Sequence, residues 1–519
     1  MRSRVPHARS DRDGPQSGPV STQRRRFLAG ATSLAAAAVA GCLDRGSDGS
    51  GGTQAAFEPS EGWPTYRGDR QRTGRAPAEA GPGESLSVAW ETSVYDLIEM
   101  RENVSAERPA EADDEPAATG YCSDVTLTDD LALCSMYYQL HEEETDGTSW
   151  GGVVALDAAG GSIEWTIPGT PAIMQAPSVA AGKLYLGVIY PMTADTDEPH
   201  VLVADATSGD VVHRHAHPGM TRGAPTFTEN STYLMAPNGA DYALEAMDPS
   251  DGTQRWTVDP PTPTADGQPL AVHDGSLLYA GHTDDDSIDL VSLATDSGDV
   301  QWRQTPERES HPSYAAPETL GMPALVGDSG YVAGPFDGYW RDDVYGGPLH
   351  AFAVDSGQTQ WQFRPEPAPY NEILGGQDAV DFCKDDESCE EPEYAALHGT
   401  PLPIDGQVVV GGVGRPAQSG ESHEKHRHLY AVDGSNGSLE WSVPGATASA
   451  VAAGDVIYAT MTDGRVQAMS TDGTVLDSVE TDAGASRSKA PAIGHGRLYV
   501  QWGSNGNSLH SPDTVAAIE

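Results

Sequence analysis

The chain has 519 residues, of which 77 are acidic and 30 are basic, so its formal net charge at pH 7 is −47. A surface with this charge repels nucleic acid, whose binding needs a basic patch, so we expect no nucleic-acid partner. Concentrated salt screens self-repulsion of this size. We therefore interpret the acidity as the adaptation of a salt-adapted archaeon to its medium, and not as evidence for a basic partner.

The N-terminal residues resemble an export signal. The stretch "RRRFLAG" contains a twin arginine before Phe27 and Leu28, and the apolar run that follows is too short to span a bilayer as a stable helix. The run ends in "VAGC", which resembles a lipobox, the motif after which a cysteine becomes lipidated. Cys42 is therefore the predicted lipid attachment site. A plain cleaved signal or an uncleaved anchor is the alternative.

These features define the expected domain organisation. We predict a twin-arginine lipoprotein signal segment at 1–41, a flexible tether at 42–61 and a single folded domain at 62–519. The protein is then exported and lipid-anchored on the outer face of the cytoplasmic membrane.

A glycine followed four residues later by an aromatic residue recurs through the folded domain. In "ALDAAGGSIEW" the glycine is Gly161 and the aromatic residue is Trp165. An aspartate stands two or four positions before most of these glycines, and both residue types favour turns, the glycine because it adopts positive φ. The seven pairs are Gly161/Trp165, Gly209/His213, Gly252/Trp256, Gly298/Trp302, Gly357/Trp361, Gly437/Trp441 and, weakly, Gly473/Asp477.

Short runs such as "KLYLGV" and "QVVVGG" precede each of these turns and are rich in β-branched and aromatic residues, as strands are. Each unit therefore predicts about four strands in about 36 to 60 residues, the size of a propeller blade. The final "TVAAIE" lacks a following turn and tryptophan, and "SLSVAWETS" around Trp90 supplies the missing strand. Pairing the two closes the ring and removes an open sheet edge. We predict an all-β propeller with eight four-stranded blades, and seven blades as the main rival.

The repeated units, together with "GWPTYRGDRQRTG" at Gly62 to Gly74, resemble the pyrroloquinoline-quinone-type β-propeller repeat family. The resemblance covers nearly everything from Trp63 onward. It implies that the turn tryptophans pack against the neighbouring blade and staple the ring, with no catalytic role. These blade-stapling residues are Trp165, Trp256, Trp302, Trp361 and Trp441.

Two long insertions interrupt the repeats, at 96–119 and at 364–397. Loops of this length in a compact fold are usually functional or disordered. The first has a disorder-like composition, whereas the second is expected to form an ordered cap and a partner surface. Within it, Cys383 and Cys389 flank "KDDES", and we predict a disulfide between them, since an exported chain meets an oxidising compartment. Cys122 and Cys134 lie on two arms of a predicted hairpin and could bridge across it.

Several histidines and carboxylates are weaker candidates for metal binding. "HEKHRH" offers His423, His426 and His428 for Zn²⁺ or Cu²⁺, but a solvated loop explains them more simply. The alternate histidines of "HRHAH" share one face of a strand, yet His213 takes the place of a stapling tryptophan. The acidic runs at 284–289 and 383–393 lack the spacing of a calcium loop. No metal is therefore predicted.

The sequence also contains three glycosylation sequons, which begin at Asn103, Asn230 and Asn436. The third lies in a predicted blade turn, where we expect it to be exposed.

The resemblance includes enzymes that oxidise alcohols or sugars with pyrroloquinoline quinone (PQQ) held beside Ca²⁺ on the propeller axis. Several of those enzymes carry adjacent cysteines over the cofactor, whereas this chain has no Cys-Cys pair, and their acid and metal-ligand positions find no match in it. We therefore expect a monomeric, non-catalytic scaffold without cofactor that binds a protein partner at the membrane surface. A fold relative with such a role is the propeller lipoprotein of the bacterial outer-membrane barrel assembly machinery, which is an analogy only. A PQQ-dependent oxidoreductase is the alternative.

Overall fold

The computed structural model places Ala55–Glu519 in one compact unit. Within this unit it describes residues 63–93, 96, 118–140, 149–169, 176–180, 182–187, 199–216, 222–228, 230–238, 241–248, 253–258, 270–282, 288–305, 318–319, 322–334, 336–337, 347–366, 368–369, 393–414, 427–481, 487–488, 491–503 and 514–519.

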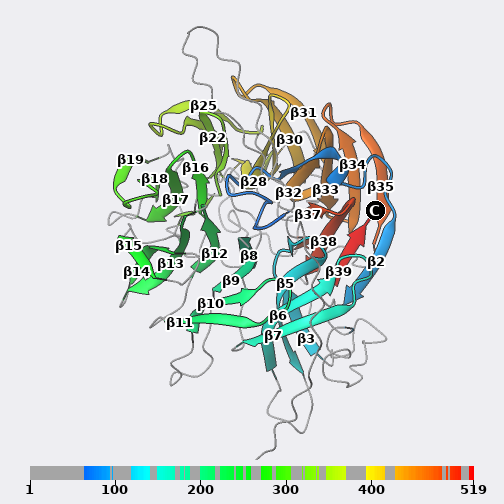
Figure 1. Cartoon of the computed structure of the whole chain (residues 1–519). Helices are drawn as coiled ribbons and strands as arrows, with labels where there is room; N and C mark the ends of the chain where they lie inside the picture. Colours follow the sequence, from blue (N-terminus) through cyan, green and yellow to red (C-terminus); the bar gives the residue numbers. More distant parts are fainter. Residues whose placement is uncertain are drawn as a thin grey trace, which may run out of the picture. The chain divides into compact units, whose positions relative to one another are not determined.

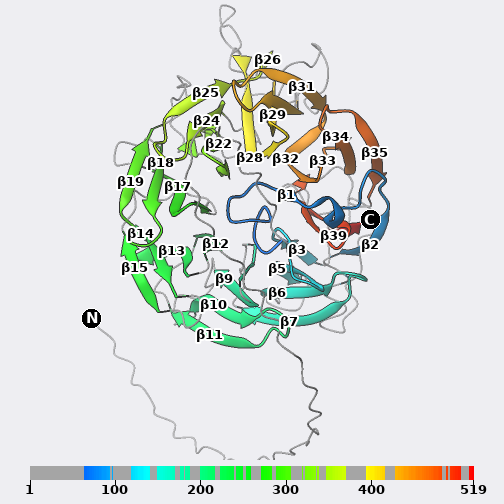
Figure 2. The same cartoon turned by 45° about the horizontal axis from the view of Figure 1, so that its top comes forward.

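The described strands form eight sheets of four radially ordered strands arranged as a ring, which confirms the predicted eight-bladed propeller (Figures 1 and 2). We number the blades in chain order and give their strands from the axis outward. Blade 1 is β4 (Thr126–Leu127), β5 (Leu131–Leu140), β6 (Ser149–Asp157) and β7 (Ile163–Gly169); blade 2 is β8 (Ser178–Ala180), β9 (Lys183–Gly187), β10 (Pro199–Asp205) and β11 (Val211–Ala216); blade 3 is β12 (Arg222–Phe227), β13 (Thr232–Asn238), β14 (Asp241–Met247) and β15 (Gln254–Val258); blade 4 is β16 (Ala271–His273), β17 (Ser276–His282), β18 (Ile288–Ala294) and β19 (Val300–Gln304).

The remaining blades complete the ring. Blade 5 is β21 (Ala324–Val326), β22 (Ser329–Ala333), β24 (Leu349–Ala353) and β25 (Thr359–Phe363); blade 6 is β28 (Ala396–Ile404), β29 (Gln407–Val413), β30 (Arg427–Asp433) and β31 (Leu439–Pro444); blade 7 is β32 (Ala446–Ala453), β33 (Val456–Met461), β34 (Arg465–Ser470) and β35 (Val475–Glu480); blade 8 is β37 (Ala492–Gly494), β38 (Arg497–Gly503), β39 (Thr514–Ile518) and β2 (Val88–Ser93). The pairing of β2 with β39 confirms the predicted closure.

Shorter elements add to this frame. β3 (Ala118–Cys122) pairs with β5, β36 (Arg487–Ser488) pairs with β38, and β1 (Arg75–Ala76) pairs in parallel with β32; β20 (Glu318–Thr319) pairs with β23 (Phe336–Asp337), and β26 (Ala368–Pro369) pairs with β27 (Glu393–Tyr394). One 3₁₀ turn, η1, spans Ala78–Ala80. No helix among the described residues is long and apolar enough to cross a membrane.

The hydrophobic core lies between neighbouring blades. Between blades 1 and 2, for example, Leu133 and Ala155 belong to the same buried cluster as Leu184 and Leu202. The middle strands are buried on both faces of each sheet, so they carry apolar residues almost continuously instead of alternating with polar ones. Each blade is therefore stabilised by its two neighbours, as in other repeat architectures.

The two faces of the ring differ. Neighbouring strands in each blade are antiparallel, so the turns from first to second strand and from third to fourth strand lie on one face, as at 128–131 and 157–162 in blade 1. We call this the turn face, and the opposite one the loop face. Both predicted insertions follow a fourth strand, so they leave the ring at the loop face. The described ends of the second insertion pair as β26 and β27, while Cys383 and Cys389 lie outside the described residues.

The turns between third and fourth strands combine an aspartate with a left-handed glycine. In blade 6 the Asp433 carboxylate accepts the N–H groups of Ser435, at 2.8 Å, and Asn436, at 3.2 Å. Gly437 follows with φ +73°. The aspartate fixes the start of the turn, and the glycine supplies a φ that other residues adopt only with strain, which explains the sequence pattern.

These hydrogen bonds make the turn sensitive to acid. Bonds from the Ser435 hydroxyl and N–H hold the pKa of Asp433 below its usual value. Because the folded-state pKa is depressed, the stabilisation is present at neutral pH and is lost as the pH falls through that pKa. We expect Asp433→Asn to lower the urea midpoint at neutral pH and to match the wild type in acid. A deficit of equal size at both pH values, measured by urea unfolding in concentrated KCl, would contradict this origin.

Candidate functional site at the ring axis

The residues Trp63–Ala76, which we call the axial segment, lie where the innermost strands converge (Figure 2). Five of its carbonyl groups accept hydrogen bonds from inner-strand N–H groups. The pairs are Leu127 to Trp63 in blade 1 (2.8 Å), Val179 to Pro64 in blade 2 (2.6 Å), Val272 to Arg70 in blade 4 (2.8 Å), Leu325 to Gln71 in blade 5 (2.9 Å) and Ala452 to Gly74 in blade 7 (2.9 Å). Carbonyl groups later in the segment bond to later blades, so the segment runs around the axis.

The five donors occupy equivalent positions in their strands. Each stands one residue before the residue that closes the first hairpin turn of its blade. In blade 4, for example, Val272 pairs with Leu277, and the pair that closes the turn is His273 with Ser276. An inner strand has no sheet partner on its axial side, so its N–H would otherwise lack a backbone acceptor. In blade 6 the equivalent residue is Pro403, opposite Val408, and proline has no N–H to satisfy. The axial segment therefore caps the inner edges of the sheets.

Two arginines extend this network from inside the segment. The guanidinium of Arg67 donates to the carbonyls of Ala450 in blade 7 and Pro401 in blade 6. Arg72 donates from Nε to the Leu270 carbonyl beside blade 4 at 3.0 Å, and from Nη1 to the Thr65 hydroxyl at 2.7 Å. Both side chains are fully buried. Arg67 therefore bonds the segment to the neighbouring blades 6 and 7, and Arg72 bonds it to the residue before blade 4.

The local conformation of the segment is dictated by close packing. Gly68 has φ +81°, and a Cβ there would lie 2.7 Å from the Trp63 ring. Gly74 has φ +71°, and a Cβ there would lie 2.5 Å from the Arg67 guanidinium. Arg67 and Arg72 also adopt left-handed backbone conformations, with φ of 62° and 63°. Such conformations persist only where surrounding contacts over-determine them, as the hydrogen bonds to the blades do here.

Burial sets the electrostatics of the segment. Burial lowers the pKa of Arg72 to about 10, although the Asp69 carboxylate opposes the shift. Burial likewise raises the pKa of Asp69, against hydrogen bonds from the Thr73 hydroxyl and N–H. Two buried cations thus share one buried anion within the segment, and backbone carbonyls supply the remaining stabilisation.

On the turn-face side of the axis, the described residues do not form a site for a Ca²⁺-bound quinone. The axial segment lies on this side, where it bonds to the inner strands. Its buried carboxylate, Asp69, is bonded to Thr73, and each of its two arginines donates to backbone carbonyls. Arg67 Nε and Arg72 Nη2 are buried without a partner among the described residues. Across the described residues, no group of three or more His, Cys, Asp or Glu side chains could hold a metal ion. A quinone with several carboxylates would need free cations and a metal-ligand set at one place.

The stapling tryptophans lie on the seams between blades. Each indole packs against the turn glycine of the following blade, as Trp302 does on Gly357 and Trp361 on Gly437. The indole N–H then donates to a carbonyl in the same turn. The bonds are Trp90 to Ala158 (3.2 Å), Trp256 to Thr295 (3.1 Å), Trp302 to Val354 (2.8 Å), Trp361 to Gly434 (2.9 Å) and Trp441 to Thr471 (2.8 Å). Trp165 packs on Gly209, but its N–H finds no partner among the described residues.

Two positions of this pattern carry other residues. His213 pairs with Val203 as Trp256 pairs with Ala246, so it occupies the tryptophan register. Asp477 occupies the same register in blade 7 and accepts the Leu86 N–H at 2.8 Å. The next blade has no turn there, because β39 and β2 belong to distant parts of the chain. An acceptor for the incoming strand therefore replaces an indole that would have had no glycine to pack on.

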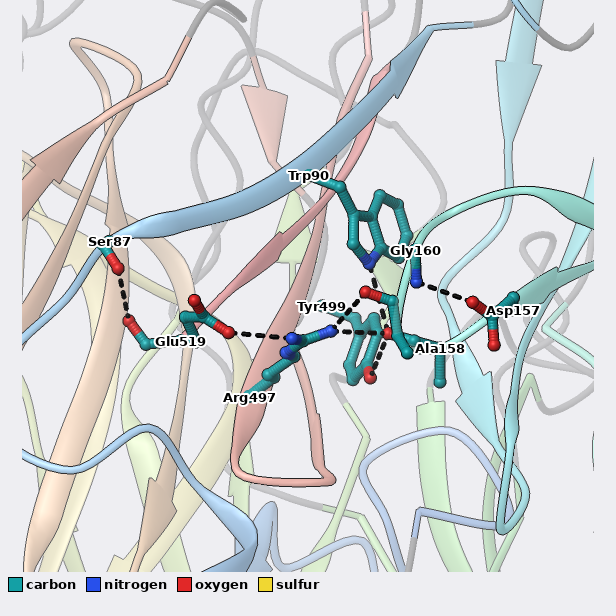
Figure 3. Close-up of polar contacts among 9 residues, drawn as sticks. Ser87, Trp90, Asp157, Ala158, Gly160, Arg497, Tyr499 and Glu519 are labelled. Carbon is teal, nitrogen blue, oxygen red and sulfur yellow. Dashed lines mark hydrogen bonds and ion pairs between the residues drawn. The ribbon is translucent and has the colours of Figure 1, made fainter.

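The seam between blades 8 and 1 has additional bonds (Figure 3). The Ala158 carbonyl accepts from Trp90, from the Tyr499 hydroxyl at 3.1 Å and from Arg497 Nη1 at 3.0 Å. Arg497 Nη2 also pairs with the Glu519 carboxylate at 2.8 Å. Ser87 and Glu519 exchange backbone hydrogen bonds of 2.7 and 2.8 Å beside it. The joint between the two ends of the ring is thus tied both within blade 8 and to blade 1.

The described cysteines do not form the possible hairpin disulfide. Cys122 and Cys134 are both buried, and neither is in a disulfide. Cys122 stands opposite Met136, two residues along β5 from Cys134, so the two cysteines are diagonal and not opposite. Diagonal positions are about 7–8 Å apart, beyond the usual Cα separation of a disulfide.

Of the three candidate metal-binding histidines, His428 alone lies among the described residues. His428 lies inside β30 and is 2% exposed, packed beside Tyr430 at a ring distance of 5.4 Å, and so is not in a solvated loop. His423 and His426 lie outside the described residues. The isolated His350 is also buried, with Nε2 2.7 Å from the Gly334 carbonyl oxygen, and burial lowers its pKa to about 4.

The comparisons with known proteins agree with this architecture. A family model described as outer membrane protein assembly factor BamB matches residues 149–313 and 346–513. No curated protein matches the chain by sequence.

Solved structures resemble the chain at low identity. Quinohemoprotein alcohol dehydrogenase from Comamonas testosteroni is 14% identical, with a TM-score of 0.56 over 89% of this chain and 81% of that chain. The corresponding enzyme from Pseudomonas putida is also 14% identical, with a TM-score of 0.54 over 89% and 80%. BamB from Moraxella catarrhalis is 13% identical, with a TM-score of 0.46 over 83% and 99%. The likeness to the two dehydrogenases shows the fold alone.

Proposed function

Because the chain belongs to the family described as outer membrane protein assembly factor BamB, we propose that it is a non-catalytic scaffold that binds a protein partner at the membrane surface. The proposal includes export by the twin-arginine signal and a lipid anchor at Cys42. The acidic surface would keep such an anchored propeller soluble in concentrated salt.

The observation that carries the proposal is the axial segment. In this chain the turn-face side of the axis holds a peptide bonded to five blades and two buried arginines with carbonyl partners. Such a centre serves to hold the blades in place. Recognition is then left to the faces of the ring, and we assign it to the loop face, from which both insertions leave.

Site-specific photo-crosslinking tests which face binds the partner. Glu366, exposed just after β25, lies at the loop face, and Asp355, exposed in the turn before the same strand, lies at the turn face. A photoreactive residue at position 366 should crosslink to one membrane-associated protein, and one at position 355 should not. The crosslink should disappear in Cys42→Ala if the lipid anchor is needed. Equal crosslinking from both faces, or none from either, would count against the proposal.

Reconstitution tests the absence of a quinone cofactor. We expect the mature chain in concentrated KCl, mixed with Ca²⁺ and pyrroloquinoline quinone and then dialysed, to show a protein absorbance spectrum and no dye-linked activity. Dialysis with Ca²⁺ omitted is the control for loosely bound quinone. Stoichiometric, Ca²⁺-dependent retention of the quinone would overturn the scaffold and favour the oxidoreductase.

A further inference from the structure

The sequon Asn436-Gly437-Ser438 lies in the blade 6 turn between β30 and β31. We propose that Asn436 is a site of N-linked glycosylation, which the folded chain presents to an oligosaccharyltransferase. In the cell this rests on the proposed export, because a folded chain would meet the transferase only after leaving the cytoplasm.

The turn already holds the sequon in an accessible shape. Asn436 and Ser438 are both exposed, and Asn436 Oδ1 accepts the Ser438 N–H at 2.8 Å. Gly437 between them has φ +73°, and its Cα side packs against Trp361 of blade 5. The bonds that hold the turn to the blade are backbone bonds and the Asp433 carboxylate bonds. Nδ2 of Asn436 donates only to its exposed neighbour, to Ser435 Oγ at 3.4 Å, so no bond of Nδ2 to the rest of the blade has to break before the transfer.

A second described sequon provides the contrast. Asn230 is exposed, but Thr232 is the first residue of β13 and is fully buried, paired with Phe227 on one side and Met247 on the other. A transferase must reach the hydroxyl of the third sequon residue as well as the asparagine. In the folded chain the Asn436 sequon is therefore accessible to the transferase, whereas the Asn230 sequon is not. Asn103 lies outside the described residues.

The group transfer needs a lipid-linked oligosaccharide phosphate as donor. Asn436 Nδ2 attacks the anomeric carbon of the sugar, an N–C bond forms, and the bond from that carbon to the phosphate oxygen breaks. The lipid phosphate leaves with the electron pair of that bond, and the amide nitrogen loses one proton. No oxidant or reductant takes part.

The test compares folded and unfolded protein in one reaction. Purified full-length chain is incubated with a purified archaeal single-subunit oligosaccharyltransferase and its lipid-linked oligosaccharide, and glycopeptides are identified by mass spectrometry. We expect glycan at Asn436 but not at Asn230 in the folded chain, and at both in the unfolded chain. Ser438→Ala should abolish glycan attachment at Asn436 without changing the denaturation midpoint. Asn230→Gln should leave the glycopeptides of the folded chain unchanged.

Other outcomes overturn the proposal. They are a folded chain modified at Asn230 as fully as at Asn436, a folded chain without glycan at Asn436, and an unfolded chain without glycan at either position. Because the assay uses purified chain, its result does not depend on export. Export is tested separately, by measuring cleavage of the signal segment and lipid attachment at Cys42.

Discussion

Arg67→Ala is expected to lower the free energy of unfolding by about 3 kcal/mol or more, because it leaves a cavity at the axis and leaves two buried carbonyls without a hydrogen-bond donor. Those carbonyls belong to Ala450 and Pro401, in neighbouring blades, and the Arg67 side chain is 1% exposed. The measurement is equilibrium denaturation in concentrated KCl, where the acidic surface is screened.

Arg70→Ala is the matched control. Arg70 belongs to the same segment and its side chain is exposed, while its contribution to the ring is a backbone carbonyl bonded to Val272. An exposed substitution of this kind typically changes stability by about 0.5 kcal/mol or less. If the two variants were equally stable, the guanidinium of Arg67 would not be holding blades 6 and 7 to the axis.

Gly357→Ala is expected to lower the free energy of unfolding strongly, although it adds only one methyl group to a turn. The residue has φ +69°, and a Cβ would lie 2.5 Å from Trp302 of the preceding blade. The variant therefore combines backbone strain with overpacking at a blade seam, for a total of about 2–4 kcal/mol. A lower unfolding midpoint should be accompanied by a change in tryptophan fluorescence, because the indole must shift.

Gly327→Ala separates the two effects. Gly327 lies in the first turn of the same blade with φ +55°, and a Cβ there would meet nothing within 4 Å. It should therefore cost about 1 kcal/mol, from backbone strain alone. Equal losses in both variants would mean that packing of the glycine on the tryptophan adds nothing to the stability of the seam.

The blades could be predicted because their signals are local and repeated. The spacing of Gly437 and Trp441 reports one turn and one strand, and seven repetitions of it predicted the strand pairings, the blade count and the closure of β39 by β2. The lack of a turn in blade 8 also explains why Asp477 departs from the pattern. Repetition thus makes even the exceptions interpretable.

The axial segment could not be predicted in the same way. Its motif is not repeated, and its hydrogen bonds reach residues such as Ala450, 383 positions away. One compositional signal was present, since Arg67, Arg70, Arg72 and Arg75 crowd into nine positions of a chain with 77 acidic residues and 30 basic ones. Two of these four arginines, Arg67 and Arg72, are the buried ones that bond the segment to the blades. The roles of Tyr499 and Arg497 at the last seam were missed because each depends on contacts between distant blades.

The path of the axial segment also constrains the order of folding. The ribosome makes residues 63–76 before any blade, yet their bonds end on strands as late as β32, and β2 must wait for β39. Neighbouring blades can assemble by local pairing while synthesis continues, but the centre stays open until blade 7 has been made. Contacts with such long separations form slowly because of the loop-closure entropy. Docking of the N-terminal residues is therefore expected to be the late, rate-limiting event in the folding of this protein.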